Sequence, residues 1–205
     1  MPPAFHAIVV SLVTGLFFFA LIAVLVRLAI QWRGSDPRSR LAVGADQGAL
    51  WSASIGTVLI LGAVITGFAI WAPSAALNSP VMRNKILTAL LLLVTYAIFI
   101  AIRWRSGEAL WQNKVLSAFY AMVAIAGFHW SMVTNSIGGD IAGIPSGYET
   151  IVQLSGVETR FTYYLPTWVL ITIVVISVAV LALAYLGGTR AETTEDETAG
   201  VDART

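Results

Sequence analysis

Long runs of apolar residues, separated by short polar connections, make up most of the chain. A helix needs about 20 apolar residues to cross roughly 30 Å of hydrocarbon. The backbone of a segment in lipid must form its hydrogen bonds within the protein, as a helix does. The runs show no alternation of apolar and polar residues that would indicate a strand, so each run predicts a helix. The runs cover residues 5–30, 49–71, 83–103, 115–137 and 165–186. We therefore predict an all-α integral membrane protein, a bundle of five transmembrane helices within residues 1–187.

Turn-forming residues separate the predicted helices. The segment 34–37, Gly-Ser-Asp-Pro, breaks the chain after the first span. Asp46 is placed to cap the start of the second helix. Gly138 and Gly139 are expected to end the fourth helix, because glycine is common just after a helix C terminus. The polar residues 188–205 predict a disordered tail.

The basic residues fall mostly on one side of the predicted bundle. With five spans, nine of the 12 Lys and Arg residues lie on the side of the first connection and the tail, and three lie on the other. Cytoplasmic loops are enriched in Lys and Arg, so we predict an external N terminus and a cytoplasmic C terminus. On this topology Trp32, Trp104 and Trp111 are expected in an inner interfacial belt.

The composition excludes several classes of protein. Hydrophobic residues make up 58% of the chain and charged residues 11%, whereas globular proteins average roughly 25% charged residues. These values exclude a soluble enzyme, a disordered chain and a nucleic-acid binder with a basic face. The net charge of +1 also creates no field that would attract a polyanion. The lack of cysteine excludes disulfides, thiolate metal sites, iron–sulfur clusters and covalently attached haem.

His6 and His129 are the candidate cofactor ligands of the chain. The five predicted spans contain no Asp or Glu, which argues against a carboxylate proton relay or a carboxylate metal centre. Counting along the helices places both histidines in the outer half of the bilayer, offset in depth by roughly 9 Å. Axial imidazoles commonly hold haem iron, so the pair predicts one b-type haem near the outer face. Two alternatives stay open: ligation of another metal by His129 together with a second subunit, and hydrogen bonding of each histidine to a polar neighbour.

Small residues recur along the second predicted helix, at Gly48, Ser52, Gly56, Ala63 and Gly67. Such spacing lets two helices approach closely, so we interpret this face as a helix-packing surface. The alternative is a flat face that admits a porphyrin or a quinone ring.

The segment Gly138–Tyr164 is the longest predicted connection and lies outside the membrane. A loop of this length is usually functional, so we interpret it as a docking surface for a periplasmic or extracellular partner. The alternative is a short helix that lies on the membrane surface.

Three short motifs resemble a family of uncharacterised prokaryotic multi-helix membrane proteins. They are Phe5-His6 at the start of the first helix, Thr66-Gly67 at the end of the second, and Gly138-Gly139-Asp140 after the fourth. The chain lacks the second histidine that the family pattern has in its first helix, and its fifth span is extra. The resemblance implies a haem-containing electron-transfer subunit in the plasma membrane of a prokaryote.

Together these features predict a subunit of a membrane-bound redox or electron-transfer complex, non-catalytic or electron-carrying rather than an enzyme on its own. Haem b would be held by His6 and His129. The alternative is a cofactor-free structural subunit that stabilises a larger membrane complex. Lipid and other membrane subunits are the expected partners, and nucleic acid is not. A small-solute transporter is disfavoured because no polar pathway crosses the predicted bundle.

Overall fold

The computed structural model describes residues 3–144, 149, 168, 171, 172 and 175. The chain divides into two units, Met1–Leu165 and Pro166–Thr205. In the second unit the described residues are helical, and the rest of the predicted fifth span, 165–186, lies outside the described residues. So do the predicted tail, 188–205, and most of the predicted external loop, 138–164.

All the regular secondary structure in the described part of the first unit is helical. In chain order its elements are α1 (Pro3–Trp32), α2 (Arg40–Ile70), α3 (Pro73–Asn78), α4 (Pro80–Ser106), the 3-10 helix η1 (Gly107–Trp111) and α5 (Lys114–Ile141). The helices α1, α2, α4 and α5 are each long and apolar enough to cross a membrane. The predicted all-α, multi-pass membrane protein is therefore confirmed for these four spans.

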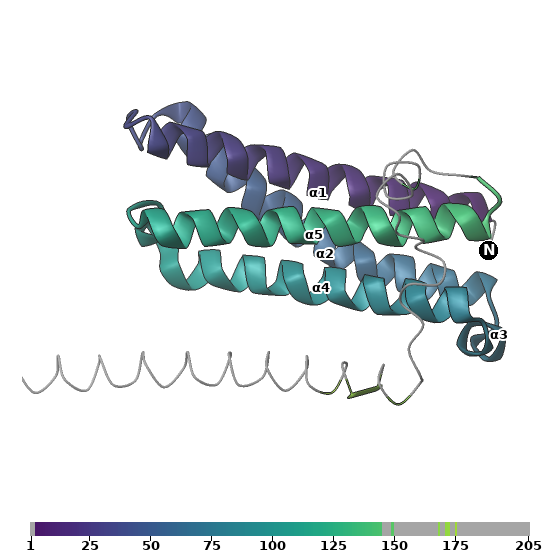
Figure 1. The fold of residues 1–205 in the computed structure, drawn as a ribbon. Coiled ribbons are helices and arrows are strands. Elements are labelled where there is room, and N and C mark those ends of the chain that lie inside the picture. Colours follow the sequence, from purple (N-terminus) through teal and green to yellow (C-terminus); the bar gives the residue numbers. More distant parts are fainter. Residues whose placement is uncertain (1–2, 145–148, 150–167, 169–170, 173–174, 176–205) are drawn as a thin grey trace, which may run out of the picture. The chain divides into compact units, whose positions relative to one another are not determined.

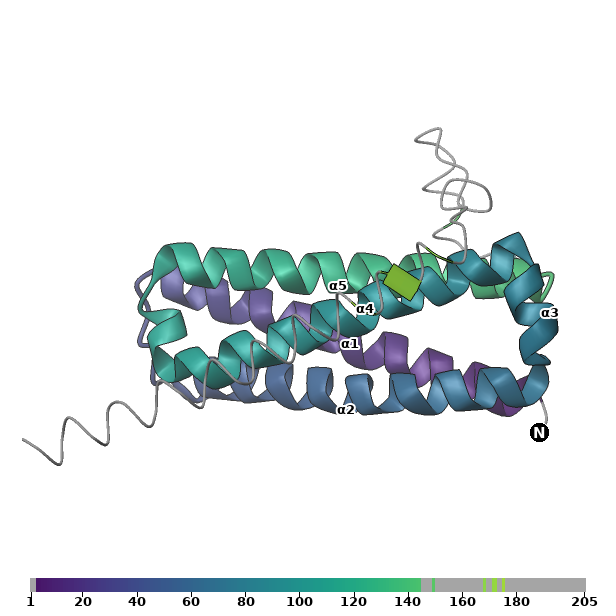
Figure 2. The same cartoon turned by 90° about the horizontal axis from the view of Figure 1, so that it is seen from below.

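The four long helices form a bundle in which each helix has two neighbours. α1 packs against α2 and α5, and α4 packs against the same two helices (Figure 1). Consecutive long helices run in opposite directions, so η1 and the turn between α1 and α2 lie at one end (Figure 2). α3, the start of α1 and the end of α5 lie at the other. We call these the η1 end and the α3 end.

The second helix begins earlier than its apolar run suggested. α2 starts at Arg40, nine residues before the predicted position 49, because the hydroxyl of Ser39 caps it by accepting a hydrogen bond from the Ala42 amide. Asp46 therefore lies inside the helix, and its predicted role as the N-cap is wrong. Its side chain is used in a contact between helices instead.

The last described helix ends later than predicted. α5 continues through Gly138 and Gly139 to Ile141, so the prediction that these glycines end the helix is wrong. The left-handed residue is Gly143, with φ of 72°. Its amide donates to the Asp140 carbonyl, and the amide of Ile144 donates to the Gly139 carbonyl. This pair of hydrogen bonds is the Schellman motif, which satisfies carbonyls at the helix end.

Stacked aromatic rings fill the centre of the bundle. Phe17 of α1 stacks on Tyr96 of α4 with 3.7 Å between ring centroids, and Phe99 stacks on Tyr120 of α5 at 4.1 Å. The edge of Tyr120 meets Trp111 of η1 at 5.7 Å. The core therefore runs as a column of aromatic side chains from the middle of the bundle to the η1 end.

The small residues of α2 face α1. A Cβ atom on Gly56 would lie 2.6 Å from the ring of Phe17, and one on Gly48 would lie 3.2 Å from Phe19. These positions must stay small for the rings to pack, so the interpretation of this face as a helix-packing surface agrees with the structure.

The same argument gives a test at Gly127 of α5, where a Cβ atom would lie 2.8 Å from the ring of Tyr96. That ring is held by its stack on Phe17, so Gly127→Ala is expected to destabilise the bundle by about 1–3 kcal/mol through overpacking. Thermal unfolding followed by circular dichroism in detergent measures the effect. Gly62→Ala is the matched control: nothing lies within 4 Å of its Cβ position, so it should not lower the midpoint. Equal loss in both variants would contradict the role given to the Tyr96 contact.

Candidate functional site

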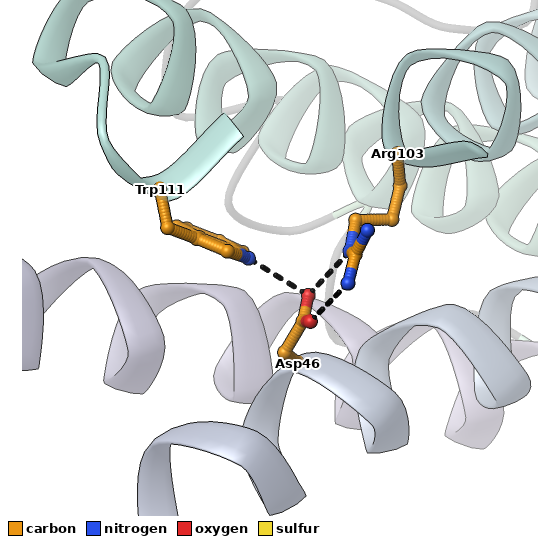
Figure 3. Close-up of polar contacts among 3 residues, drawn as sticks. All are labelled: Asp46, Arg103 and Trp111. Carbon is orange, nitrogen blue, oxygen red and sulfur yellow. Dashed lines mark hydrogen bonds and ion pairs between the residues drawn. The ribbon is translucent and has the colours of Figure 1, made fainter. Parts of the chain in front are cut away.

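A buried carboxylate joins three elements at the η1 end of the bundle. Asp46 of α2 meets Arg103 from the last turn of α4 and Trp111 from η1 (Figure 3). The guanidinium of Arg103 donates from Nε to Oδ1 at 2.8 Å and from Nη2 to Oδ2 at 2.6 Å. The indole of Trp111 donates from Nε1 to Oδ1 at 2.9 Å.

Local structure explains why these side chains converge. Asp46 lies on the same face of α2 as Ala42, Ala49 and Ala53, a spacing of three to four residues that turns all of them toward the bundle interior. After α4 the chain tightens into η1, which carries the indole of Trp111 back over the carboxylate (Figure 3). Asp46 is 6% exposed and Arg103 is 8% exposed.

Asp46 lies within the helix α2, three residues before the predicted span 49–71, which itself contains no Asp or Glu. One sequence-based prediction is wrong at this point. Trp111 was expected in the inner aromatic belt, yet it is 6% exposed and faces the core. Trp32 and Trp104, at 59% and 81% exposed, do lie on the surface as a belt requires.

The first helix reaches the same site through Trp111. The guanidinium carbon of Arg27 lies 4.9 Å from the centroid of the indole ring, which is a cation–π contact. One turn further along α1, Gln31 donates from Nε2 to the backbone carbonyl of Trp111. All four long helices thus contribute to one cluster, since Tyr120 of α5 also packs against Trp111.

This cluster is suited to hold helices together rather than to perform acid–base chemistry. Three charge-assisted or polar donors already occupy both oxygens of Asp46, so a metal or a substrate would have to displace one of them. A bidentate arginine–carboxylate pair also fixes the relative position of its two helices more strictly than a single hydrogen bond does.

The α3 end contains a smaller polar contact, built on the predicted ligand His6. Its Nδ1 lies 2.9 Å from the hydroxyl of Thr66 on α2. The same hydroxyl lies within hydrogen-bonding distance of the Gly62 carbonyl of its own helix, at 2.9 Å. The tautomer that satisfies all three groups is the one with the proton on Nδ1, because Nδ1 then donates to the hydroxyl and the hydroxyl donates to the carbonyl.

The surroundings of His6 leave room for its ring and add a cation. A Cβ atom on Gly67 would lie 3.4 Å from the imidazole, so this glycine lets the ring lie against α2. Lys85 of α4 interacts electrostatically with the imidazole, and its ammonium packs on Gly138 of α5. Parts of all four long helices therefore also meet at the α3 end.

His129, the second predicted ligand, lies elsewhere. It is exposed on the surface of α5, with its ring 5.4 Å from that of Trp130. Phe18 of α1 lies beside Phe128 of α5, with 5.4 Å between their ring centroids, and this contact sets the two antiparallel helices in register.

The register shows how far apart the two histidines are along the bundle. His6 is twelve residues from Phe18 toward the α3 end, or about 18 Å at 1.5 Å per residue, whereas His129 is a single residue beyond Phe128. The remaining offset along the helix axis is about 16 Å. His6 is bonded to Thr66 of α2, whereas His129 is exposed on the surface of α5, and haem ligation by the pair stays a prediction without geometric support.

Among the residues that the structure describes, no group of three or more His, Asp or Glu side chains is placed to hold a metal ion. Comparison with protein-family models, with curated proteins and with solved structures gave no match. The function must therefore be argued from the clusters at the two ends of the bundle.

The buried pair gives a test of what holds the η1 end together. Asp46→Asn leaves Arg103 buried without its carboxylate, and removing one partner of such a pair typically destabilises a protein by about 3–5 kcal/mol. The double variant Asp46→Leu with Arg103→Met removes both charges and is expected to regain most of that loss. Thermal midpoints in one detergent compare the variants, with Arg105→Gln, a change at an exposed arginine in the last turn of the helix that carries Arg103, as the control. A double variant as unstable as the single one would rule out charge pairing as the cause.

Proposed function

We propose that the protein is a non-catalytic structural subunit of a larger membrane complex, located in the plasma membrane of a prokaryote. The proposal rests on one observation: the buried polar groups at both ends of the bundle form contacts between helices. Asp46 is committed to Arg103 and Trp111 at one end, and His6 is bonded to Thr66 at the other. A bundle braced at both ends is a rigid element against which other membrane helices can pack.

The surface of the bundle supports this proposal. Large apolar side chains are exposed along its helices, among them Phe19 at 53%, Trp51 at 62% and Ile65 at 70%. Such side chains are compatible with lipid and with the apolar helices of a partner. The resemblance to a prokaryotic membrane-protein family supports the location.

The proposal includes five spans, an external N terminus and a cytoplasmic C terminus. Of the nine Lys and Arg residues in the described part of the chain, seven lie at the η1 end and two at the α3 end. Those at the η1 end are Arg27, Arg33, Arg38, Arg40, Arg103, Arg105 and Lys114, and those at the α3 end are Arg83 and Lys85. This distribution supports a cytoplasmic η1 end.

Single cysteines test the topology cleanly, because the chain has none of its own. Ser74→Cys in α3 is expected to react with a membrane-impermeant maleimide on intact cells. Ser35→Cys, between α1 and α2, should react only after permeabilisation, as should Thr205→Cys if the fifth span crosses. Both Ser74 and Ser35 are exposed, so access does not limit the reaction. The reverse pattern for Ser74 and Ser35 would contradict the orientation, and external labelling at Thr205 would contradict the fifth span.

A second candidate, an electron-transfer subunit with haem b, is favoured by the state of His6. Ligating histidines usually donate their other ring nitrogen to a hydrogen-bond acceptor, which fixes the tautomer. With the proton on Nδ1 the Thr66 hydroxyl fills that role, and Nε2 of His6 would then be the nitrogen that binds an axial iron. On this candidate the second ligand comes from outside the described residues of the chain or from a partner subunit.

Purification from native membranes in a mild detergent distinguishes the two candidates. A structural subunit is expected to migrate on a native gel in a complex well above its own 21.9 kDa, and the complex should lose abundance when the chain is depleted. The isolated chain should show no Soret absorption. Stoichiometric haem that is lost in His6→Ala and kept in His129→Ala would favour the electron-transfer candidate. A solitary chain without haem would overturn both.

A further inference from the structure

Each of the four long helices carries an exposed basic residue at its η1 end. Arg33 directly follows the last residue of α1, and Arg105 lies in the last turn of α4. Arg40 is the first residue of α2, and Lys114 is the first residue of α5. Because these helix termini lie at the same end of the bundle (Figure 2), the four side chains surround it with positive charge. We call them the basic ring.

The described part of the chain does not neutralise the basic ring. None of its four side chains forms an ion pair or a hydrogen bond with another described residue. Arg38, in the turn between α1 and α2, adds a fifth exposed cation. The exposed acids described at this end are Asp36 and Glu108, so five cations face two anions and leave a net charge of +3.

The stability of the helices does not explain the basic ring. A cation in the last turn of a helix is favoured by the negative end of the helix dipole, whereas a cation in the first turn is opposed by the positive end. Arg40 and Lys114 occupy the first positions of α2 and α5, and neither helix has an acidic residue in its first turn. These two side chains therefore add positive charge where the helix already presents it, which favours an anion from outside the described chain.

Two exposed tryptophans place the basic ring at the membrane surface. Trp32 precedes Arg33 and Trp104 precedes Arg105, and the tryptophans are 59% and 81% exposed. Exposed tryptophans of membrane proteins lie at the level of the lipid headgroups, and a guanidinium binds phosphate through two parallel hydrogen bonds. We propose that the basic ring binds the headgroups of anionic phospholipids, such as phosphatidylglycerol, around the η1 end of the bundle.

The position of the ring favours lipid over other anions. A membrane presents phosphates at one depth on every side of the bundle, which matches one cation on each long helix, whereas a soluble acidic protein would reach one side. Phosphatidylcholine carries a cation beside its phosphate, so a headgroup with net negative charge is preferred. Each Lys or Arg close to an anionic membrane surface strengthens binding by about fivefold. Neither proposed function uses these side chains, so the proposal is independent of both.

Electron spin resonance of spin-labelled lipids tests the proposal, because it measures how strongly the protein retains each headgroup. The full chain is placed in phosphatidylcholine bilayers with a trace of labelled phosphatidylglycerol or labelled phosphatidylcholine. The wild type is expected to retain phosphatidylglycerol several-fold more strongly, and high salt should reduce this preference by screening. Arg40→Gln should lower it by up to about fivefold. The matched control, Arg83→Gln, removes a cation at the α3 end and should keep the full preference.

The salt dependence of the wild type keeps the proposal testable if Arg40→Gln does not fold. Equal retention of the two lipids would overturn the proposal, and an equal loss in Arg83→Gln would overturn the location at the η1 end. Displacement of phosphatidylglycerol by inorganic phosphate at constant ionic strength would also overturn it, because the ligand would then be free phosphate. So would a preference that appears only after the four acids of residues 192–197 are replaced by amides, because the tail would then balance the charge in the full chain.

Discussion

The carboxylate of Asp46 imposes the strictest constraint on this bundle. A carboxylate inside an apolar protein is tolerated only when its charge and its lone pairs are met by partners. Arg103 supplies two donors and Trp111 a third. The geometry of these bonds requires the start of α2, the end of α4 and the whole of η1 to keep one relative position. The rotation of α2 that puts Asp46 inside also turns Gly48 and Gly56 onto the rings of α1, so the packing of α1 follows from the same requirement.

Different kinds of contact join the helices at the two ends of the bundle, and this difference decides where a ligand could bind. At the η1 end a charged pair, a cation–π contact and an aromatic edge combine around Trp111. At the α3 end the described contact between α1 and α2 is a neutral one, from His6 to Thr66. An imidazole has a second ring nitrogen that can bind another group, whereas both oxygens of Asp46 already accept hydrogen bonds. The contacts that fix the helices therefore concentrate at the η1 end, and any ligand binding by His6 would take place at the α3 end.

The sequence predicted the four described spans because apolar runs of that length have few other uses. It did not predict the cluster around Asp46. The start of the second helix was placed at its first apolar residue, so Asp46 was interpreted as the N-cap of that helix. A signal was present: Asp46 stands in register with Ala42, Ala49 and Ala53, the pattern of an inward face. The partner Arg103 carried no comparable signal, because an arginine at a helix end is equally expected to reach the membrane surface. Which side chains pair between two helices depends on how the helices pack, and a single sequence does not show that packing.

Depth counting misjudged the two histidines for a related reason. It measured each helix from its own basic end and assumed that these ends lie at one level. In the structure the register of α1 and α5 is set by Phe18 against Phe128, which gives a larger offset between His6 and His129 than the count from the basic ends did. Basic residues are equally poor depth markers when they are buried. Arg27 is the first charged residue of the predicted span 5–30, yet its guanidinium contacts the face of Trp111 and the residue is buried. Because Asp46 is bonded to Arg103 and Trp111, Arg27 joins the cluster through the face of the Trp111 indole and not through the carboxylate.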